Sequence, residues 1–352
     1  MTSPYAVHPL DVHDDALLAR AHEIMRRAAL EDGRPFMTMW SLERMTVVVR
    51  EPGEDEEIAL LGAFPTDAPP GPDTLVGVAF VHRDLASNTD KTFADLYVEP
   101  DRRRRGIGRA LADGIAADSA ARGRPQVIGD AKVPFAERED GPTMRFAAAT
   151  GFRLALLEIV RELTLPVDDA LLDRLHDAAA PRFADYDVVL VDGIPEERLL
   201  PSYVDLLNQL SVEAPSGDLD FEEEAQTVSG VRDYLQKRID GGQRVLMALA
   251  VHRDEPDVVV AHSDLIAPRG EAYVYQENTL VRRDHRGHKL GTLVKVANLR
   301  QLQRLLPERT RVITQNAEVN EAMIGINEEL GFAAVAAAPG FLRVLEPTGG
   351  DA

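Results

Sequence analysis

In the first half of the chain, apolar runs typical of strands alternate with segments whose apolar residues recur at helical spacing. Asp14–Ala29 carries apolar residues at helical spacing, so a helix is expected there. After Thr92–Val98, a second apolar stripe predicts a helix that packs on a sheet, with Ile107, Ala110, Leu111, Gly114 and Ile115 on one face. Apolar runs predict strands at Ile58–Phe64, Thr74–Val81, Thr92–Val98, Gln126–Asp130 and, as a β-rich pair, Phe152–Leu165.

The second half of the chain repeats this order. Helices are expected around Glu196–Leu210 and Glu222–Ile239, then from Leu290, and at Glu318–Leu330. Strands are predicted at Arg244–His252, Val258–Ile266, Glu271–Val281 and Arg311–Thr314. Because strand clusters alternate with helices, each half is predicted to be α/β, with a mixed, mostly antiparallel sheet flanked by helices.

The two halves also share a motif. Val98–Gly108 aligns with Val281–Gly291 at an offset of 183 residues, and each copy lies between a predicted strand and a predicted helix. A Gly-Phe pair follows each copy at similar range, at Gly151-Phe152 and Gly331-Phe332. This offset far exceeds the repeat length of solenoid proteins, which is about 20–50 residues, so the pattern indicates a duplicated domain.

A length of 352 residues also favours two domains. We expect the first at residues 1–165, a connector with one short helical pattern at 166–185, and the second at 186–347. The Gly-rich residues 348–352 are expected to be a disordered tail.

Composition narrows the classes of function. The chain has no cysteine, which excludes a disulfide scaffold, thiolate catalysis and cysteine-ligated metal sites, and fits a reducing cytoplasm. The N-terminus does not resemble a signal peptide, and no apolar run approaches the roughly 20 residues that span a bilayer. The net charge of −20 argues against nonspecific binding of nucleic acid. We therefore expect a cytoplasmic protein that binds neither membranes nor nucleic acid.

Against this acidic background, Arg102–Arg105 is a local basic cluster. It could be a solvated patch or a nuclear-localisation-like run. Its position at the start of a predicted helix favours an anion site, because a helix N-terminus presents free backbone N–H groups and a partial positive charge. Gly106 and Gly108 would let the backbone approach a phosphate closely.

These residues resemble a known family. Arg103-x-x-Gly106-x-Gly108 is similar to the pyrophosphate loop of the GNAT superfamily of acetyl-coenzyme A-dependent N-acyltransferases. The second copy departs from the pattern, with Lys289 at the first glycine position. Asn316 to Met323, running into Leu330-Gly-Phe332, resembles the family's other signature. The two-domain layout is similar to that of bacterial tandem acetyltransferases of the mycothiol synthase type.

The resemblance implies acetyl-coenzyme A as co-substrate, with no metal. It places coenzyme-binding residues at Leu96, Val98, Arg103, Arg104, Gly106, Gly108, Thr279, Val281, Arg286, Gly287, Gly291, Asn316 and Asn320. Lys289 leaves two alternatives open, because its side chain either clashes with the coenzyme or points outward while Gly287 and Gly291 serve the loop. His285 and His288 are interpreted as solvated loop residues.

For catalysis, the resemblance implies a strand carboxylate as base and a tyrosine four residues before Gly-Phe as acid. The tyrosine position holds Ala147 in the first half and Asn327 in the second. Asn327 could still bond to the sulfur, and Tyr273 or Tyr275 could replace the tyrosine. Glu277 is the candidate base in the second half, and Asp95 is its equivalent in the first. The polar strand Tyr275–Thr279 favours turnover in the second half, with Glu277, Asn327 and Tyr275 as catalytic residues.

The expected reaction is acetyl transfer from acetyl-coenzyme A to the primary amine of a small molecule, by a monomer or homodimer. The alternative is a coenzyme A-binding sensor or scaffold whose catalysis has been lost. The two missing tyrosines favour this alternative, whereas the polar strand and the Asn316/Asn320 pair favour the enzyme.

Overall fold

The computed structural model describes residues 3–30, 39–213, 216–222 and 225–346. The chain folds into two compact units. Unit 1 combines Met1–Glu158 with Ser216–Glu222 and Ala336–Ala352, and unit 2 combines Ile159–Pro215 with Glu223–Val335. Each unit thus contains segments that are distant in the sequence, whereas the domains expected from the sequence are continuous. The expected domain bounds stay a prediction. The expected disordered tail lies outside the described residues.

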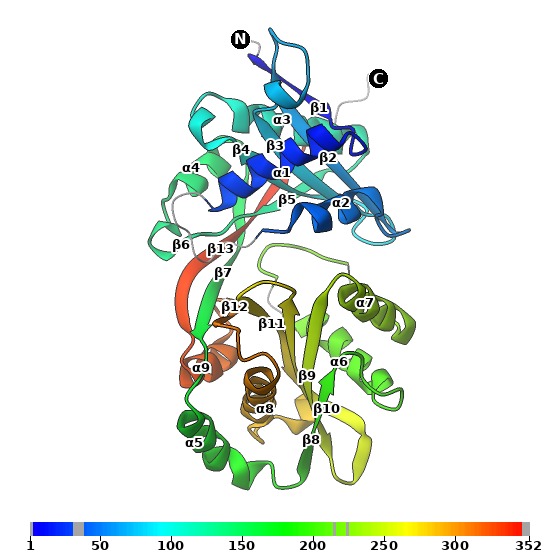
Figure 1. Ribbon diagram of the computed structural model, residues 1–352, viewed down its shortest axis with the longest axis vertical. Coiled ribbons are helices and arrows are strands. Elements are labelled where there is room, and N and C mark those ends of the chain that lie inside the picture. The colour runs from blue at the N-terminus through cyan, green and yellow to red at the C-terminus, as the bar shows by residue number, and fades with distance from the viewer. Residues whose placement is uncertain (1–2, 31–38, 214–215, 223–224, 347–352) are drawn as a thin grey trace. The chain divides into compact units, whose positions relative to one another are not determined.

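In unit 1 the strands lie in the order β1-β2-β3-β4-β5-β13. Strands β1 to β4 pair antiparallel, β4 and β5 pair parallel, and β5 pairs antiparallel with β13 (Figure 1). The bounds are β1 (Tyr5–Pro9), β2 (Glu56–Pro65), β3 (Gly77–Asp84), β4 (Lys91–Val98), β5 (Gln126–Asp130), β6 (Val133–Pro134), β7 (Arg153–Thr164) and β13 (Ala333–Val344). Strands β7 and β13 each have residues in both units.

Helices cover both faces of the unit 1 sheet. Successive side chains of a strand point to opposite faces. Leu60 and Val78 accordingly belong to the core under α1 and α2, whereas Leu61 and Ala79 belong to the core under α3. The bounds are α1 (Asp15–Leu30), α2 (Leu42–Arg50), α3 (Ile107–Ala121) and α4 (Pro142–Ala149).

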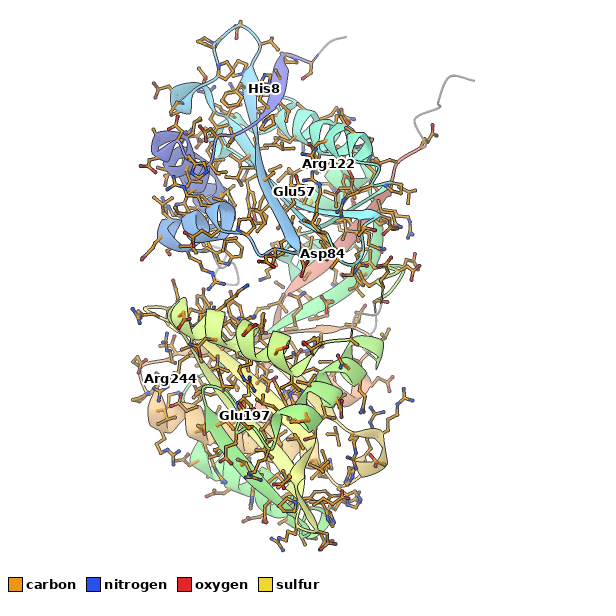
Figure 2. The ribbon with its side chains drawn as sticks, turned by 90° about the vertical axis from the view of Figure 1, so that its right-hand side faces the viewer. His8, Glu57, Asp84, Arg122, Glu197 and Arg244 are labelled. Atoms are coloured by element: carbon orange, nitrogen blue, oxygen red, sulfur yellow. The ribbon has the colours of Figure 1, made fainter. Side chains whose placement is uncertain are left out.

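A charged network joins β2 and β3 to α3. The guanidinium of Arg83 is fully buried and forms ion pairs with Glu57, at 3.1 Å, and with Asp118. Arg122 also contacts Asp118. It lies 3.2 Å from Glu57, and Figure 2 labels both Arg122 and Glu57. A buried guanidinium must be paired, because burial removes the water that would otherwise solvate its charge.

In unit 2 the strands lie in the order β12-β11-β10-β9-β8, and β7 lies beside β12. Strands β8 to β11 pair antiparallel, and β11 pairs parallel with β12. The strand bounds are β8 (Tyr186–Asp192), β9 (Gln243–His252), β10 (Glu255–Pro268), β11 (Tyr273–Val281) and β12 (Arg311–Ala317). The helix bounds are α5 (Asp169–Ala179), α6 (Leu200–Glu213), α7 (Val228–Asp240), α8 (Leu290–Leu305) and α9 (Glu321–Leu330).

The segment expected to be a connector is packed into unit 2. Val167 and Leu172 are buried in one cluster with Val296, Leu299 and Leu302 of α8. Helices α5 and α8 lie on one side of the unit 2 sheet, and α6 and α7 cover the other (Figure 1). Within the described ranges, no helix is both long and apolar enough to cross a membrane.

Candidate functional site

The loop between β4 and α3 contains two residues in the left-handed region. Arg104 has a φ of 63°, and Gly106, the residue that precedes α3, has a φ of 91°. Because glycine precedes the helix, the N-cap side chain offers no acceptor to the backbone N–H groups of the first turn. Uncapped N–H groups at a helix N-terminus bind phosphate well. The loop therefore has the backbone geometry of an anion site.

The loop before α8 has the same conformation. Gly287 has a φ of 88° and Lys289 a φ of 56°, so the left-handed positions are those of Arg104 and Gly106 shifted by 183 residues. A Cβ at Gly106 would meet no heavy atom within 4 Å, and Lys289 is exposed. Lysine at this position therefore leaves the path of the loop unchanged.

The second glycine of each loop is required by packing. A Cβ at Gly108 would lie 3.0 Å from Cε2 of Phe146, and one at Gly291 would lie 2.9 Å from Cδ1 of Ile326. Each glycine thus allows its helix to pack closely against the next helix of the same unit. The coenzyme-binding role that the sequence assigns to Gly108 and Gly291 stays a prediction.

Residues after α5 anchor the loop of unit 2. Arg182 donates to the backbone oxygen of Gly287 at 3.2 Å, and Nδ1 of His288 lies 3.0 Å from the backbone oxygen of Arg182. The Tyr186 hydroxyl lies 2.9 Å from Nδ1 of His285. Both histidines therefore help to anchor the loop. His288 is exposed, as predicted, whereas His285 is half-buried.

The arginines of the two loops lie against the protein. Arg103 donates to the backbone oxygen of Ala28 at 3.3 Å, and Arg286 donates to that of Val281 at 3.2 Å. Arg103 and Arg104 are both exposed, as is Arg286. These side chains add positive charge beside each helix N-terminus, which favours an anionic ligand.

In both units the two strands next to the loop diverge. The parallel ladder of β4 and β5 ends at Phe93↔Ile128, and that of β11 and β12 ends at Tyr275↔Ile313. The expected coenzyme residues on these strands, Leu96, Val98, Thr279 and Val281, all lie beyond these points. Their backbone groups are therefore available to bind an extended ligand such as the pantetheine arm.

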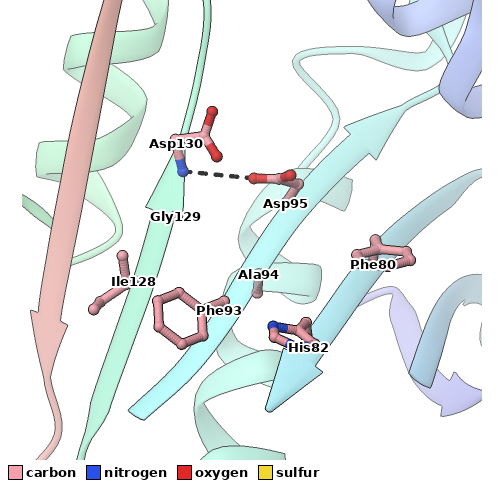
Figure 3. Close-up of a pocket in the computed structure, with 8 residues that line it drawn as sticks. All are labelled: Phe80, His82, Phe93, Ala94, Asp95, Ile128, Gly129 and Asp130. Atoms are coloured by element: carbon pink, nitrogen blue, oxygen red, sulfur yellow. Dashed lines mark hydrogen bonds between the residues drawn. The ribbon is translucent and has the colours of Figure 1, made fainter. Parts of the chain in front are cut away.

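In unit 1 a cavity of about 110 Å³ lies where β4 and β5 diverge. Its walls are formed by residues of the three adjacent strands β3, β4 and β5, and Figure 3 shows Asp95 and Asp130 together at one end of it. The other lining residues are Phe80, His82, Phe93, Ala94, Ile128 and Gly129. The register explains this grouping, because Phe80 lies opposite Asp95, and His82 opposite Phe93.

The two carboxylates of this cavity influence each other. The backbone N–H of Asp130 donates to Oδ1 of Asp95 at 3.5 Å. Burial, and secondly the charge of Asp130, raise the pKa of Asp95 to about 8. Two neighbouring carboxyl groups of this kind share a proton at neutral pH. Asp130 was not predicted from the sequence, although it lies two residues after Ile128 as Asp95 lies two residues after Phe93.

Tyr97 lies two residues after Asp95, on the same face of β4. Burial, and secondly the charge of Asp95, raise the pKa of its hydroxyl above the ordinary range. Tyr97 therefore keeps its proton at neutral pH and can donate it in a hydrogen bond. Tyr97 was not predicted as an acid, because the strand tyrosines expected in that role, Tyr273 and Tyr275, belong to the second half of the chain.

Glu277 of unit 2 corresponds to Asp95 in structure. Each lies two residues beyond the last pair of its parallel ladder. The β10–β11 register shifts by one residue between Ser263↔Thr279 and Leu265↔Gln276, whereas the β3–β4 register is continuous. This bulge explains why Glu277 lies four residues before Val281, and Asp95 only three before Val98.

The surroundings of Glu277 differ from those of Asp95. Oε1 of Glu277 lies 3.0 Å from Nη2 of Arg238, which also contacts the Tyr234 hydroxyl. Burial raises the pKa of Glu277, and the charge of Arg238 opposes this effect. Glu277 is thus a paired carboxylate, whereas Asp95 faces a cavity.

A buried polar cluster near Glu277 was not predicted. Oδ2 of Asp264 accepts from the Tyr203 hydroxyl at 3.0 Å and lies 3.0 Å from Nδ1 of His262. All three residues are buried, and Nε2 of His262 and Oδ1 of Asp264 have no partner among the described residues. The polar run from His262 to Asp264 in an otherwise apolar strand is the signal that could have revealed this cluster.

The amide of Asn327 is engaged on both sides. Its oxygen accepts from Nζ of Lys295 at 2.8 Å, and its nitrogen donates to Oδ1 of Asn316 at 2.8 Å. Asn320 caps α9 by accepting from the backbone N–H of Met323 at 3.3 Å. Tyr275 packs on Tyr273, with ring centroids 5.1 Å apart. Glu277, Asn327 and Tyr275 thus contact different groups: Arg238, the pair Lys295 and Asn316, and Tyr273.

Comparison with known proteins identifies the fold. No family model matches the sequence, and no curated protein matches it significantly. Among solved structures, a tandem GNAT protein from the clavulanic acid biosynthesis pathway is similar over 98% of this chain and 100% of its own, with a TM-score of 0.76 and 24% identity. A GCN5-related N-acetyltransferase from Sphaerobacter thermophilus is similar over 100% of this chain and 99% of its own, with a TM-score of 0.63 and 14% identity. The resemblance and the α/β fold class predicted from the sequence are confirmed at the level of structure: the chain has the tandem GNAT fold.

Proposed function

We propose that the protein is an acyl-coenzyme A-dependent N-acyltransferase, which transfers acetyl from acetyl-coenzyme A to the primary amine of a small molecule in unit 1. The observation that carries the proposal is the position of Asp95. It lies beyond the point where β4 and β5 diverge, beside a cavity, on the strand that leads to an uncapped helix N-terminus. A thioester and an amine could meet there.

The residues present fit the coenzyme. Two left-handed residues direct the loop backbone at the start of α3, and the diverging strands leave backbone groups for the pantetheine amides. When bound, the coenzyme would supply the activated acyl group. The remaining chemistry belongs to the side chains of the cavity.

Asp95 accepts the proton that the attacking amine must lose. A general base works best when its pKa lies near the pH of the reaction, and the pKa of Asp95 is about 8. As the new C–N bond forms and the C–S bond breaks, the departing sulfur needs a proton. Tyr97, which keeps its proton, is the candidate donor. The cationic amine is attracted by the carboxylates of Asp95 and Asp130.

The sequence favours turnover in unit 2, through Glu277. We prefer unit 1, because Arg238 occupies the carboxylate of Glu277 and the amide of Asn327 already has two partners. Glu277 remains the alternative base, supported by its position beside the bulge of β11.

Two matched substitutions distinguish the units. Asp95→Asn in the full chain is expected to lower kcat by about 10²–10⁴-fold, which is the usual cost of losing a general base. Glu277→Gln should stay within a few-fold of wild type, and calorimetry should show unchanged coenzyme affinity for both variants. Loss of activity in Glu277→Gln alone would move the reaction to unit 2.

A second function has one specific observation in its favour. Unit 2 has the same loop conformation and strand divergence as unit 1, yet its equivalent carboxylate is ion-paired. Unit 2 could thus bind coenzyme without turnover, as a sensor or scaffold. Coenzyme that protects unit 2 amides from hydrogen exchange while Asp95→Asn abolishes all transfer would support this role.

A further inference from the structure

We propose that residues 216–222, which lie between α6 and α7 in the sequence, complete the acceptor site of unit 1 and select a primary amine with a flat apolar body. The inference rests on the proposed function of unit 1 and deepens it. Ser216–Glu222 belongs to unit 1, although the helices on either side belong to unit 2. The second half of the chain thus contributes to the site of the first.

One end of this segment is anchored on β7. The backbone N–H of Asp218 donates to the oxygen of Ala155 at 2.9 Å, and the carboxylate of Asp218 pairs with Arg153 at 2.5 Å. Gly217 has a φ of 62°, and a Cβ there would lie only 2.2 Å from the oxygen of Ala155. Glycine is therefore required, because both the backbone conformation and the close approach exclude a side chain.

The other end is anchored on the connection between β3 and β4. The backbone N–H of Glu222 donates to Oδ1 of Asn88 at 2.9 Å, and the backbone N–H of Asn88 donates to Oε2 of Glu222 at 2.8 Å. Asn88 is buried and adopts a φ of 47°. Two reciprocal hydrogen bonds to a buried residue hold this end in one place.

Between these anchors, two apolar side chains extend the wall of the cavity. Leu219 is 6% exposed and packs against Ile128, a lining residue. Phe221 stacks on Phe93, another lining residue, with ring centroids 6.2 Å apart and planes 19° apart. Phe221 is nevertheless 40% exposed, so part of its ring remains available to a ligand.

The positions of the carboxyl groups and the aromatic rings indicate the chemistry of the ligand. The carboxylates of Asp95 and Asp130 attract an ammonium group, whereas the rings of Phe93 and Phe221 favour a flat apolar group. The cavity of about 110 Å³ is small, so it admits only the amino end of the acceptor. The remainder would then lie along the aromatic rings, outside the cavity.

A single tryptophan makes binding measurable without turnover. Trp40 is the only tryptophan of the chain, and its ring lies 5.7 Å from that of Phe80, a lining residue. The test titrates the full chain with 2-phenylethylamine and, as a probe without a flat group, ethanolamine. Trp40 fluorescence reports binding, and release of free thiol from acetyl-coenzyme A reports transfer.

Phe221→Ala is expected to weaken binding of 2-phenylethylamine about 2–12-fold, which corresponds to an aromatic contact of about 0.5–1.5 kcal/mol. Binding of ethanolamine should not change. Gly217→Ala should have the same selective effect, because it lifts the segment from β7. Val344→Ala, at an exposed apolar position of unit 1, is the control, and melting curves verify that each variant is folded.

The two proposals fail in different ways. Selective weakening by both variants without any transfer would overturn the proposed function and leave the binding site standing. Transfer that neither variant alters, with 2-phenylethylamine bound as in wild type, would overturn the role of residues 216–222. Equal weakening of both amines would also overturn it, because selectivity for a flat group would then be absent.

Discussion

Asp95 links activity to stability in unit 1. Its pKa is about 8 in the folded protein and about 3.9 in an unfolded chain. The folded state therefore holds a proton that the unfolded state releases between these values. The stability that Asp95 contributes is fully present below about pH 4 and is lost as the pH rises through 8.

We expect Asp95→Asn to remove this dependence, because an amide does not titrate. The melting temperature of the variant, relative to wild type, should rise from pH 5 to about pH 8 and level off above it. In the wild type, kcat/KM should increase with pH up to about 8, as the base loses its proton. A constant difference in melting temperature across this range would show that Asp95 has an ordinary pKa.

For Lys295 of α8, in unit 2, we expect the opposite pH dependence of stability. Its ammonium group is buried, and burial lowers its pKa to about 7, against about 10.4 when unfolded. The lowered pKa costs the folded state progressively more stability as the pH falls from about 10 to about 7. Lys295→Met loses one hydrogen bond to Asn327, worth about 1 kcal/mol, but removes the buried charge. The melting temperature of the variant, relative to that of wild type, should therefore be higher at pH 6 than at pH 9. The reverse order would contradict the lowered pKa of Lys295.

Several residues of the candidate site could be predicted from the sequence one by one, but the side chains that contact them could not. The sequence marks Asp95 and Glu277 as polar residues in apolar strands. Their roles differ because Asp130 is contributed by β5 and Arg238 by α7, which lie 35 and 39 residues away in the sequence. Partners at such distances depend on strand register and helix packing, which local patterns do not specify.

At the scale of elements, the two loops that precede α3 and α8 provide a matched experiment. The positions of Gly106 and Lys289 are both left-handed, with φ of 91° and 56°. A left-handed conformation costs a non-glycine residue about 1–2 kcal/mol. Gly106→Ala should therefore lower the urea midpoint, whereas Lys289→Gly should raise it. The gain in unfolding free energy for Lys289→Gly should be less than about 1 kcal/mol, once glycine's extra freedom in the unfolded state is subtracted. Shifts of the same sign would contradict a shared loop conformation.

The sequence predicted these loops well because their signals are local. Arg104 and Gly106, with their counterparts at an offset of 183 residues, lie between an apolar strand and an amphipathic helix. The bulge of β11 was not predicted, since it appears only as a register shift against β10. It adds one residue before Val281, and Glu277, which lies next to the bulge, pairs with Arg238 of α7.

At the scale of the whole molecule, the sequence repeat predicts two domains but does not indicate which strands belong to each. Two copies of a motif suggest two continuous domains, and a cut near Leu165 would separate them. The structure pairs β13, near the end of the chain, with β5 of unit 1, and the domain bounds expected from the sequence stay a prediction. Strand partners of such large sequence separation leave no periodic signal, because apolar residues in β13 would suit either sheet.

This arrangement predicts the behaviour of a truncated chain. A protein that ends at residue 165 lacks β13, and its β5 loses the five pairs from Gly340↔Asp130 to Val344↔Gln126. It also lacks Leu219 and Leu342, which bury Ile128. We expect residues 1–165 to melt without a cooperative transition by circular dichroism, because an exposed apolar edge strand is unstable and aggregates. The matched variant joins residues 333–346 to residue 165 through a flexible linker and should recover a cooperative transition. Equal, cooperative melting of both proteins would show that β13 is not needed, and that the first half folds as a continuous domain.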